Sequence, residues 1–556
     1  MDRNTLTALL LITIVLILTP YYMDLISPQP QQRYENIDDY SNDKNENQNS
    51  YIGDDYSNNA TILEKPQPKK TKEIITAIES DVFIAKLSSL CGGSIISFEL
   101  KNHLGIDSSF VNLSSKDNKN NLLVGFRDLD GETIELKEGW VLEGSYDSLY
   151  INSKTTLKYT YAYGKEKVIK KITLYPNSFV FDIELDMTSV ANKLLEEQVS
   201  FSWVGGLPPT EKDSTAEEYF FGTYLYQGGE LLDVKVSKGE SFENSYRGKT
   251  DWIATRSKYF VAATMAEDDM GFLGASVSAS NNTSELYDIK TYLNPNYKNN
   301  FSFYLGPLEY ERIKNLGVGL ESTMDFGWAI IRPISKGVLW ALKSMHNYIP
   351  NYGIVLIIFS ILVKLAVYPL TKRSYESTRA MQALTPELNK LKEKHKNNQQ
   401  KLQQAQMELY KKKGVNPFGT CLPMLLQMPL LFALFTVFRS TIELRGEPFV
   451  FWIKDLSAPD IIFYLPFKIP LYGNYVCALP IFMALSMFLQ QKMMMTGGSA
   501  QQEQQKLMQY FMMGFFFLIF NSFPSGLNLY YTLFNVLTIA QQKLTGQKPP
   551  EPTGAT

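Results

Sequence analysis

A lysine inside an apolar segment has the most unusual chemistry in this sequence. Lys364 lies in residues 359–366, where every other residue except Ser360 is apolar. It precedes Lys372 by eight residues, which is about 12 Å along a helix. If Lys372 marks the membrane surface, the side chain of Lys364 is too short to bring its ammonium group fully into water there. A lysine at the centre of a bilayer costs about 2.5–3.5 kcal/mol and commonly marks a function. We expect a hydrated pocket around Lys364, with extension to the membrane surface as the alternative.

Other polar residues at helical spacing could line the same pocket. Ser360 precedes Lys364 by one helical turn on the same face. Gln427 and Gln490 each interrupt another apolar segment. The last apolar segment carries a polar stripe at three- and four-residue intervals, formed by Asn528, Tyr531, Asn535, Thr538 and Gln542. Single polar residues of this kind commonly hydrogen-bond between membrane helices, but the stripe together with Lys364 favours a groove.

Motifs for covalent chemistry are missing from the sequence. Gly248-Lys249-Thr250 resembles the end of a phosphate-binding loop, but Glu243 occupies the position where that motif requires glycine. There is no HExxH or GxSxG motif, and the three cysteines form no CxxC pair. We therefore expect no catalytic residue, no cofactor and no metal site. The net charge of −3 also argues against a DNA partner.

Two other function classes remain as alternatives at this point. A transporter of anions or other solutes could use Lys364 as a binding site near the membrane midplane, but it predicts inverted repeats, which the unequal apolar spans do not show. A sugar epimerase would need convergent acid and base groups in a β domain that contains one histidine, His103.

The first part of the 556-residue chain is an apolar segment followed by a polar one. Residues 1–26 are predicted to be an uncleaved transmembrane anchor, because the run at 6–18 is followed by no small-residue cleavage site. Residues 27–73 are rich in Asn, Asp, Gln and Ser and are predicted to be a disordered periplasmic tether. The anchor and this tether give the domain that follows no fixed place at the groove.

Residues 74–320 show the alternation typical of β-strands. Runs at 156–161, 167–174 and 178–185 alternate apolar and polar residues and are rich in β-branched and aromatic types. The segment 163–167 contains glycine between two such runs and predicts a hairpin turn. With few helical windows over about 250 residues, a large all-β sandwich is expected.

The period changes to that of helices after residue 320. An amphipathic helix at 322–346 is predicted to lie at the membrane surface, with packing on the β domain as the alternative. Five apolar spans follow at 353–371, 417–441, 476–495, 507–523 and 525–543. With the anchor they predict an all-α membrane domain of six spans. Its core is expected at 321–546.

The charge of one connecting segment predicts the orientation. Residues 372–413 carry eleven Lys and Arg against four Glu, which places this segment in the cytoplasm. Residues 27–345 are then periplasmic, and both termini, including the short tail 547–556, are cytoplasmic. Two helices at 374–413, bending near Asn397-Asn398, should form a projecting helical hairpin. We expect it to be a docking arm for an anionic partner such as ribosomal RNA or acidic lipid, with a merely solvated surface as the alternative.

Four motifs in the last third of the chain closely resemble those of the YidC/Oxa1/Alb3 family of membrane protein insertases. In order they are Tyr368-Pro369-Leu370-Thr371, Val415-Asn416-Pro417-Phe418-Gly419, residues 422–429 (LPMLLQMP) and residues 523–531 (FPSGLNLYY). The anchor and the large outer β domain resemble the form found in Gram-negative bacteria. That resemblance implies a periplasmic β-supersandwich like that of sugar mutarotases, in the bacterial inner membrane.

The resemblance also implies a function and a set of contact residues. Members insert and chaperone nascent membrane proteins from the ribosome, alone or with the Sec translocon, without nucleotide. Their hydrophilic groove opens to the cytoplasm and to lipid and carries a positive residue, which is arginine in many members and Lys364 here. Lysine keeps the charge but lacks the planar fork of arginine. The expected groove contacts for a substrate are Lys364, Ser360, Gln427, Gln490, Asn528, Tyr530, Tyr531 and Asn535.

In this reading the groove holds the polar flank of an incoming helix while the apolar part enters lipid between the third and fifth spans. The basic hairpin would meet the ribosome or the signal recognition machinery, and membrane lipids would surround the spans.

Overall fold

The computed structural model describes residues 71–545 apart from several internal segments. These gaps are 106–107, 115–118, 145, 213–216, 236–240, 281–285, 396–397, 416–421, 471 and 495–499. The expected anchor at 1–26, the tether up to residue 70 and the tail at 547–556 lie outside the described residues.

Strands dominate the described chain up to residue 307. In chain order they are β1 (Ile75–Glu79), β2 (Phe83–Ser88), β3 (Ser94–Leu104), β4 (Phe110–Asn112), β5 (Leu123–Asp128), β6 (Thr133–Glu135), β7 (Trp140–Leu142), β8 (Ser148–Tyr150), β9 (Thr155–Tyr163), β10 (Glu166–Leu174), β11 (Val180–Asp186), β12 (Leu194–Trp203), β13 (Gly222–Gln227), β14 (Glu230–Val234), β15 (Ser241–Arg256), β16 (Phe260–Ala266), β17 (Phe272–Ser280), β18 (Leu286–Leu293) and β19 (Lys298–Pro307). Short 3₁₀ turns at Leu90–Gly92 and Ala191–Lys193 connect some of them.

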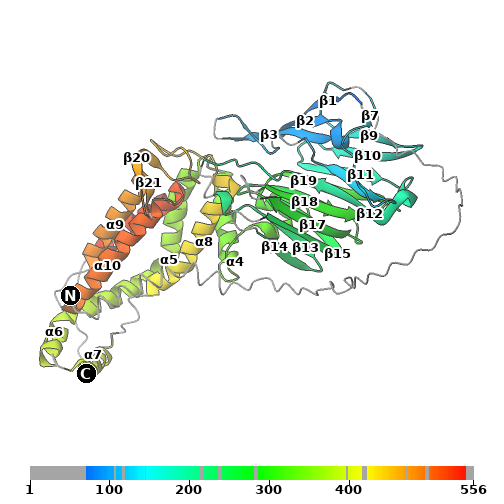
Figure 1. Cartoon of the computed structure of the whole chain (residues 1–556). Helices are drawn as coiled ribbons and strands as arrows, with labels where there is room; N and C mark the ends of the chain where they lie inside the picture. Colours follow the sequence, from blue (N-terminus) through cyan, green and yellow to red (C-terminus); the bar gives the residue numbers. More distant parts are fainter. Residues whose placement is uncertain are drawn as a thin grey trace, which may run out of the picture.

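The strands form two packed sheets (Figure 1). A five-stranded sheet has the order β4-β3-β2-β1-β8, and a fourteen-stranded sheet runs from β6 through β15 to β7, with β13 and β14 attached beside β15. Phe98 of the small sheet meets Phe181 of the large one, with ring centroids 5.7 Å apart. The large sheet also curls onto itself, because Trp203 of β12 lies 5.1 Å from Phe303 of β19 although four strands separate them in the sheet. The expected all-β sandwich is confirmed.

The hairpin β9–β10 shows how the sequence produces this sheet. Every second residue of both strands is buried, so one face lies in the core. The strands pair from Thr155↔Leu174 to Tyr163↔Glu166, and Gly164 supplies the positive φ of 64° in the turn. The predicted turn at 163–167 is therefore present. The alternation also buries one lysine, Lys170, on the core face.

The rest of the described chain is helical apart from one hairpin. After α3 (Tyr310–Lys314) and a 3₁₀ turn at Leu320–Thr323, the helices are α4 (Arg332–His346), α5 (Tyr352–Ala383), α6 (Thr385–Lys394), α7 (Gln399–Lys412), α8 (Leu422–Ser440), α9 (Ala478–Met494), α10 (Ala500–Phe520) and α11 (Ser525–Thr545). The 3₁₀ turn η5 (Ile442–Leu444) and the strands β20 (Ile461–Ile469) and β21 (Gly473–Cys477) lie between α8 and α9. The helices extend from one end of the sandwich as an elongated bundle (Figure 1).

Several helix boundaries differ from those expected, among them the start of α10 at Ala500 rather than at 507. The amphipathic helix begins at Arg332 and not at 322, because Gly327 adopts a φ of 81° and Pro333 fits only a first helical turn. Its buried residues include Val338, Leu339 and Leu342, and it packs on α8 and α5. The expected span at 353–371 is part of a helix that continues through Pro369 to Ala383, so no break separates it from the start of the basic segment.

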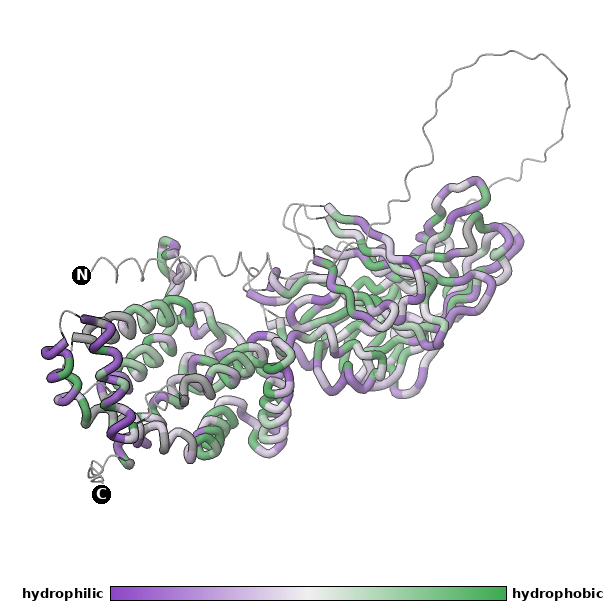
Figure 2. Tube along the Cα trace, turned by 90° about the horizontal axis from the view of Figure 1, so that it is seen from below, coloured by the Kyte–Doolittle hydropathy of each residue, from purple (hydrophilic) through white to green (hydrophobic). Residues whose placement is uncertain are grey.

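The basic segment ends in a pair of short helices, α6 and α7. The side chain of Asn398 accepts a hydrogen bond from the backbone N–H of Lys401 at 3.0 Å and caps α7, close to the expected bend. Lys413 and Glu387 form an ion pair of 2.8 Å across the pair. Figure 2 shows hydrophilic residues concentrated on these helices, at the end of the bundle farthest from the sandwich.

Length and composition alone identify few membrane spans. Among the described helices, Tyr352–Pro369 is long and apolar enough to cross a bilayer, and Tyr510–Phe520 is a shorter apolar segment. The helix α9 contains 17 residues.

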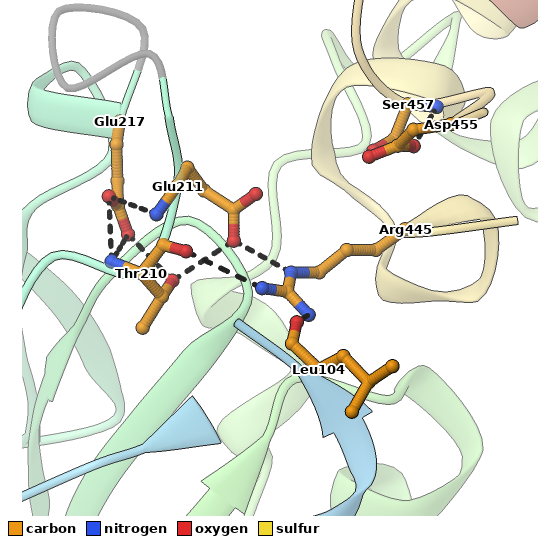
Figure 3. A network of polar contacts seen from close by, with 7 residues as sticks. All are labelled: Leu104, Thr210, Glu211, Glu217, Arg445, Asp455 and Ser457. Atoms are coloured by element: carbon orange, nitrogen blue, oxygen red, sulfur yellow. Dashed lines mark hydrogen bonds and ion pairs between the residues drawn. The ribbon is translucent and has the colours of Figure 1, made fainter. Parts of the chain in front are cut away.

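The sandwich is bonded to the helical bundle by buried and half-buried charges (Figure 3). The guanidinium group of Arg445, just after η5, forms a 2.7 Å ion pair with Glu211 and donates a 2.9 Å hydrogen bond to the carbonyl oxygen of Leu104. Lys343 of α4 bridges Glu309 of the sandwich at 3.4 Å and Glu443 of η5 at 3.0 Å. These bonds join the sandwich to α4 and to the segment around η5, and the expectation that it has no fixed place at the groove stays a prediction.

Candidate functional site

Lys364 lies against α11 in the interior of the bundle. Its side chain is buried, and its ammonium group donates a 2.7 Å hydrogen bond to the hydroxyl of Thr538. The same nitrogen lies 4.5 Å from the ring centroid of Phe534, one turn earlier on α11. Both partners are neutral, and within the described part of the chain no ion pair involves Lys364. The cation is thus held by a hydroxyl and an aromatic face rather than by a carboxylate.

Ser360 is fully buried one turn before Lys364 on α5. Its hydroxyl donates a 2.7 Å hydrogen bond to the carbonyl oxygen of Leu356 in its own helix. Serine hydroxyls in apolar helices often make this bond because no water is available. Ser360 is therefore close to the lysine in the helix, but its hydroxyl is engaged with the backbone.

The polar stripe of α11 joins several helices together. The amide nitrogen of Asn528 donates to the carbonyl oxygen of Phe520 at the end of α10, at 3.0 Å. That of Asn535 donates to the hydroxyl of Ser486 on α9 at 3.1 Å. Together with the bond from Lys364 to Thr538, these contacts attach α11 to α10, α9 and α5. The interhelical role left open by the sequence is present at Asn528 and Asn535.

Several polar atoms on α11 are buried without a hydrogen-bond partner among the described residues. They are Oδ1 of Asn528, the hydroxyls of Tyr530 and Tyr531, and both amide atoms of Gln542. The ring of Tyr530 packs between Phe359 and Phe534, at centroid distances of 6.2 and 6.0 Å, and the ring of Tyr531 meets Phe520 at 5.8 Å. A buried polar group without a partner costs about 1–3 kcal/mol, so these atoms are unusual for a purely structural core.

The two expected glutamines lie apart from this cluster. Gln427 on α8 and Gln490 on α9 are half-buried, and no hydrogen bond within the described part of the chain joins either of them to Lys364 or to the α11 stripe. Of the eight expected contact residues, the structure brings Lys364, Ser360 and the four on α11 to the α5, α9 and α11 region.

Sequence reasoning missed three residues that complete this cluster. Phe534 provides the aromatic face for Lys364, Ser486 accepts from Asn535, and Thr371 accepts a 3.3 Å hydrogen bond from Gln541. Thr538 was recognised as part of the stripe but not as the partner of Lys364. Its position four residues after Phe534 places both on one face of α11, which is the signal that could have identified the pair.

The remaining chemistry of the described chain gives no sign of an active centre. No group of His, Cys, Asp and Glu among the described residues could hold a metal ion. His103, the histidine of the sandwich, packs edge-on against Phe260 at 5.9 Å. Burial, with a smaller contribution from Arg445, lowers the pKa of His103 to about 4. It is therefore neutral at physiological pH and poorly suited to act as a base.

Comparisons with known proteins agree on one family. A family model described as "YidC periplasmic domain" matches residues 75–341, and one described as "60Kd inner membrane protein" matches residues 344–551. The membrane protein insertase YidC of Chlorobaculum parvum is 35% identical over 571 aligned residues, which cover 98% of this chain and 94% of the relative. The chain belongs to the YidC family of membrane protein insertases.

Other known proteins are also similar to this chain. The YidC of Chlorobium luteolum is 36% identical over 562 residues, with 98% of this chain and 94% of the relative covered. A crystal structure of an active YidC insertase with the first transmembrane domain resolved shares 18% identity, covers 86% of this chain and 93% of that one, and gives a TM-score of 0.36.

Family membership decides several expectations. The resemblance inferred from the four motifs is confirmed, and YidC proteins are insertases of the inner membrane rather than enzymes. It also implies that nascent membrane proteins are the substrates and that lipids surround the protein. The solute transporter is not favoured.

Proposed function

We propose that this protein inserts and helps to fold inner-membrane proteins through the polar cluster around Lys364, without nucleotide hydrolysis. The observation that carries this proposal is a buried cation with neutral partners, next to a helix whose tyrosine and asparagine oxygens have unmet hydrogen bonds. Such atoms can receive the polar flank of a substrate, which shortens the apolar path that the flank must cross.

The cluster as described is closed, so insertion requires it to open. The bond between Lys364 and Thr538 joins α5 to α11, and that between Asn535 and Ser486 joins α11 to α9. When α5 and α11 separate, the ammonium group of Lys364 loses its hydroxyl partner and becomes available to an acidic segment of the substrate. Water and the substrate then replace Thr538, and the groove faces the cytoplasm and lipid.

The proposed topology has six spans and a cytoplasmic arm. The anchor at 1–26 and the five spans within 321–546 cross the membrane, both termini lie in the cytoplasm, and residues 27–345 are periplasmic. The excess of basic residues at 372–413 supports this orientation. The arm of α6 and α7 would contact the ribosome or the signal recognition machinery, and the Sec translocon would pass other substrates to the same groove.

The test separates the charge of Lys364 from its bond to α11. Proteoliposomes containing Lys364→Ala, Lys364→Arg or Thr538→Val are given one substrate with an acidic translocated tail and one with a neutral tail. If the charge acts in a low-dielectric groove, Lys364→Ala slows the acidic substrate by roughly 5- to 150-fold, equivalent to about 1–3 kcal/mol, and Lys364→Arg is tolerated.

Thr538→Val is the matched control, because it removes the hydroxyl partner and keeps the charge. Near-normal insertion by Thr538→Val with impaired Lys364→Ala supports a direct role of the cation. An equal loss of insertion in both variants would show that Lys364 acts only as a contact between helices. Insertion at wild-type rates by Lys364→Ala would contradict the proposal.

A further inference from the structure

The hairpin β20–β21 is a separate two-stranded sheet at the sandwich-facing end of α9 and α10 (Figure 1). Its strands pair antiparallel with each other and with no other described strand. An isolated two-stranded hairpin is only marginally stable in water. The surroundings of this hairpin must therefore contribute to its stability.

The hairpin is apolar and exposed on both faces. The strand β20 reads IIFYLPFKI, in which Lys468 is the one charged residue. Phe463 and Tyr464 pair with Val476 and Tyr475 in consecutive register, so their side chains point to opposite faces. Phe463 is 52% exposed and Tyr464 is 67% exposed. A strand that is apolar on both faces is typical of one covered on both sides.

This arrangement distinguishes lipid from a protein partner. A protein surface docked on one face would leave the other face in water, whereas acyl chains surround both. The aromatic composition also fits, because tyrosine, tryptophan and phenylalanine are favoured at the boundary between acyl chains and headgroups. Phe451 and Trp452, in the segment before β20, are exposed beside the hairpin as well.

Buried polar groups attach the hairpin to the helices. The carboxylate of Asp460 accepts hydrogen bonds from the backbone N–H groups of Ala478 and Leu479 at 3.0 and 2.8 Å, which caps the start of α9. The side chain of Asn521, after α10, donates to the carbonyl oxygens of Tyr472 and Tyr475 at 2.8 Å each. The hairpin is thus held in one position and does not fold its apolar side chains into the bundle.

The apolar surface continues from the hairpin onto α9. Exposed apolar residues run along this helix at Ile481, Phe482, Leu485 and Leu489. The rings of Trp452 and Phe482 stack at 6.3 Å and connect the two surfaces. The helix α9 begins at Ala478, directly after the last residue of β21, so the two exposed apolar surfaces adjoin.

We propose that β20–β21 is embedded in the lipid leaflet at the amino-terminal end of α9, where it continues the exposed apolar surface of that helix. Acyl chains cover both faces of β20, and the exposed ammonium group of Lys468 meets the phosphate groups. The proposal rests on membership of an inner-membrane family and is independent of the role given to Lys364.

The test places an environment-sensitive fluorophore on each face of the strand. In a background with Cys91, Cys421 and Cys477 replaced, Phe463→Cys or Tyr464→Cys is labelled with a nitrobenzoxadiazole dye and reconstituted in phosphatidylethanolamine and phosphatidylglycerol vesicles. Tyr297→Cys is the control, because this residue is 59% exposed on the sandwich. Brominated acyl chains and aqueous iodide serve as the two quenchers.

We expect blue-shifted emission and quenching by brominated chains at both 463 and 464, with iodide quenching restricted to 297. Quenching of either hairpin site by iodide and not by brominated chains would overturn the proposal. Shielding of one face alone would instead indicate a docked protein and would also contradict it. Phe467→Cys, at a side chain that is 61% exposed, repeats the measurement if either first variant folds poorly.

Discussion

Two of the buried lysines of the described chain, Lys170 and Lys364, are accommodated in different ways. Lys170, in the core of the sandwich, donates hydrogen bonds to the carbonyl oxygens of Cys91 and Leu122 at 3.0 and 2.6 Å. Lys364, in the bundle, has one hydroxyl and an aromatic ring. The lysine of the sandwich is therefore bound by fixed backbone acceptors, which is typical of a structural role, whereas the lysine of the bundle depends on a side chain of a neighbouring helix.

Lys170 makes the stability of the sandwich depend on pH. Burial lowers the pKa of Lys170 to about 7 from an unfolded value of 10.5, so the unfolded state binds more protons between these values. The contribution of this residue to stability therefore rises with pH through the window from about 7 to 10.5. We expect Lys170→Met to flatten the change of the melting temperature of the sandwich over this window.

Thermal unfolding of the full chain in detergent, followed at several pH values, measures this slope. The surface variant Lys137→Met is the control, because Lys137 is half-exposed and pairs with Glu135 at the surface. An unchanged slope in Lys170→Met would show that Lys170 does not titrate in this range.

At the scale of elements, the sequence was sufficient where a local pattern determined the structure. The period-two alternation and the glycine-containing segment 163–167 predicted β9 and β10, and the apolar spacing of the basic segment predicted two helices with a bend near Asn398. The start of α4 was predicted too early, because apolar periodicity continues before Arg332 while Gly327 and Pro333 determine where the helix can begin.

The partners of the site residues could not be predicted in the same way. Lys364 and Thr538 are 174 residues apart, and Arg445 and Glu211 are 234 apart. No local pattern in one sequence indicates which distant helices or loops meet. The polar stripe of α11 was visible because its spacing is local, but whether it would line a groove or bond to other helices depended on the packing of α5 and α9 against it.

The arm of α6 and α7 is expected to be required for insertion. Deleting residues 377–411 removes most of the excess positive charge of the basic segment, and should abolish insertion in proteoliposomes supplied with ribosome-bound chains. A charge-reversed arm with Lys390→Glu, Lys392→Glu and Lys394→Glu separates the effect of charge from that of shape. This variant should also lose insertion, whereas the corresponding Gln variant should retain intermediate insertion activity. Full insertion without the arm would mean that it is only a solvated surface.

On the scale of the whole molecule, the sandwich and the bundle form one connected body. Arg445 contacts Glu211 and Leu104, which come from different parts of the sandwich, and its side chain is 6% exposed (Figure 3). Glu217 supports this contact by accepting hydrogen bonds from the backbone N–H groups of Thr210 and Glu211 at 3.0 Å. These bonds fix the backbone of the acidic partner that Arg445 contacts.

Arg445→Ala should loosen this connection. Removing one partner of a buried ion pair typically costs about 3 kcal/mol, so amide exchange around residues 210–211 and 442–445 should accelerate by roughly 100-fold if it requires separation of the two parts. Hydrogen–deuterium exchange of the full chain in nanodiscs measures this. Lys137→Ala, at an exposed pair of the same sandwich, should leave exchange unchanged. Unchanged exchange in Arg445→Ala would show that other contacts hold the parts together.

The unbroken helix α5 has a mechanical consequence. It carries Lys364 near its middle and ends at Ala383, directly before the arm, so the two are linked by one rod of about 28 Å. Pro369 lies between them and removes one backbone hydrogen bond, which makes this point the most pliable of the rod. Under the proposed function, a load on the arm reaches the segment that carries Lys364 only through Pro369, where the helix bends most easily. The lysine of that segment bonds α5 to α11, so the proposed arm and the proposed opening contact belong to one helix that is jointed at Pro369.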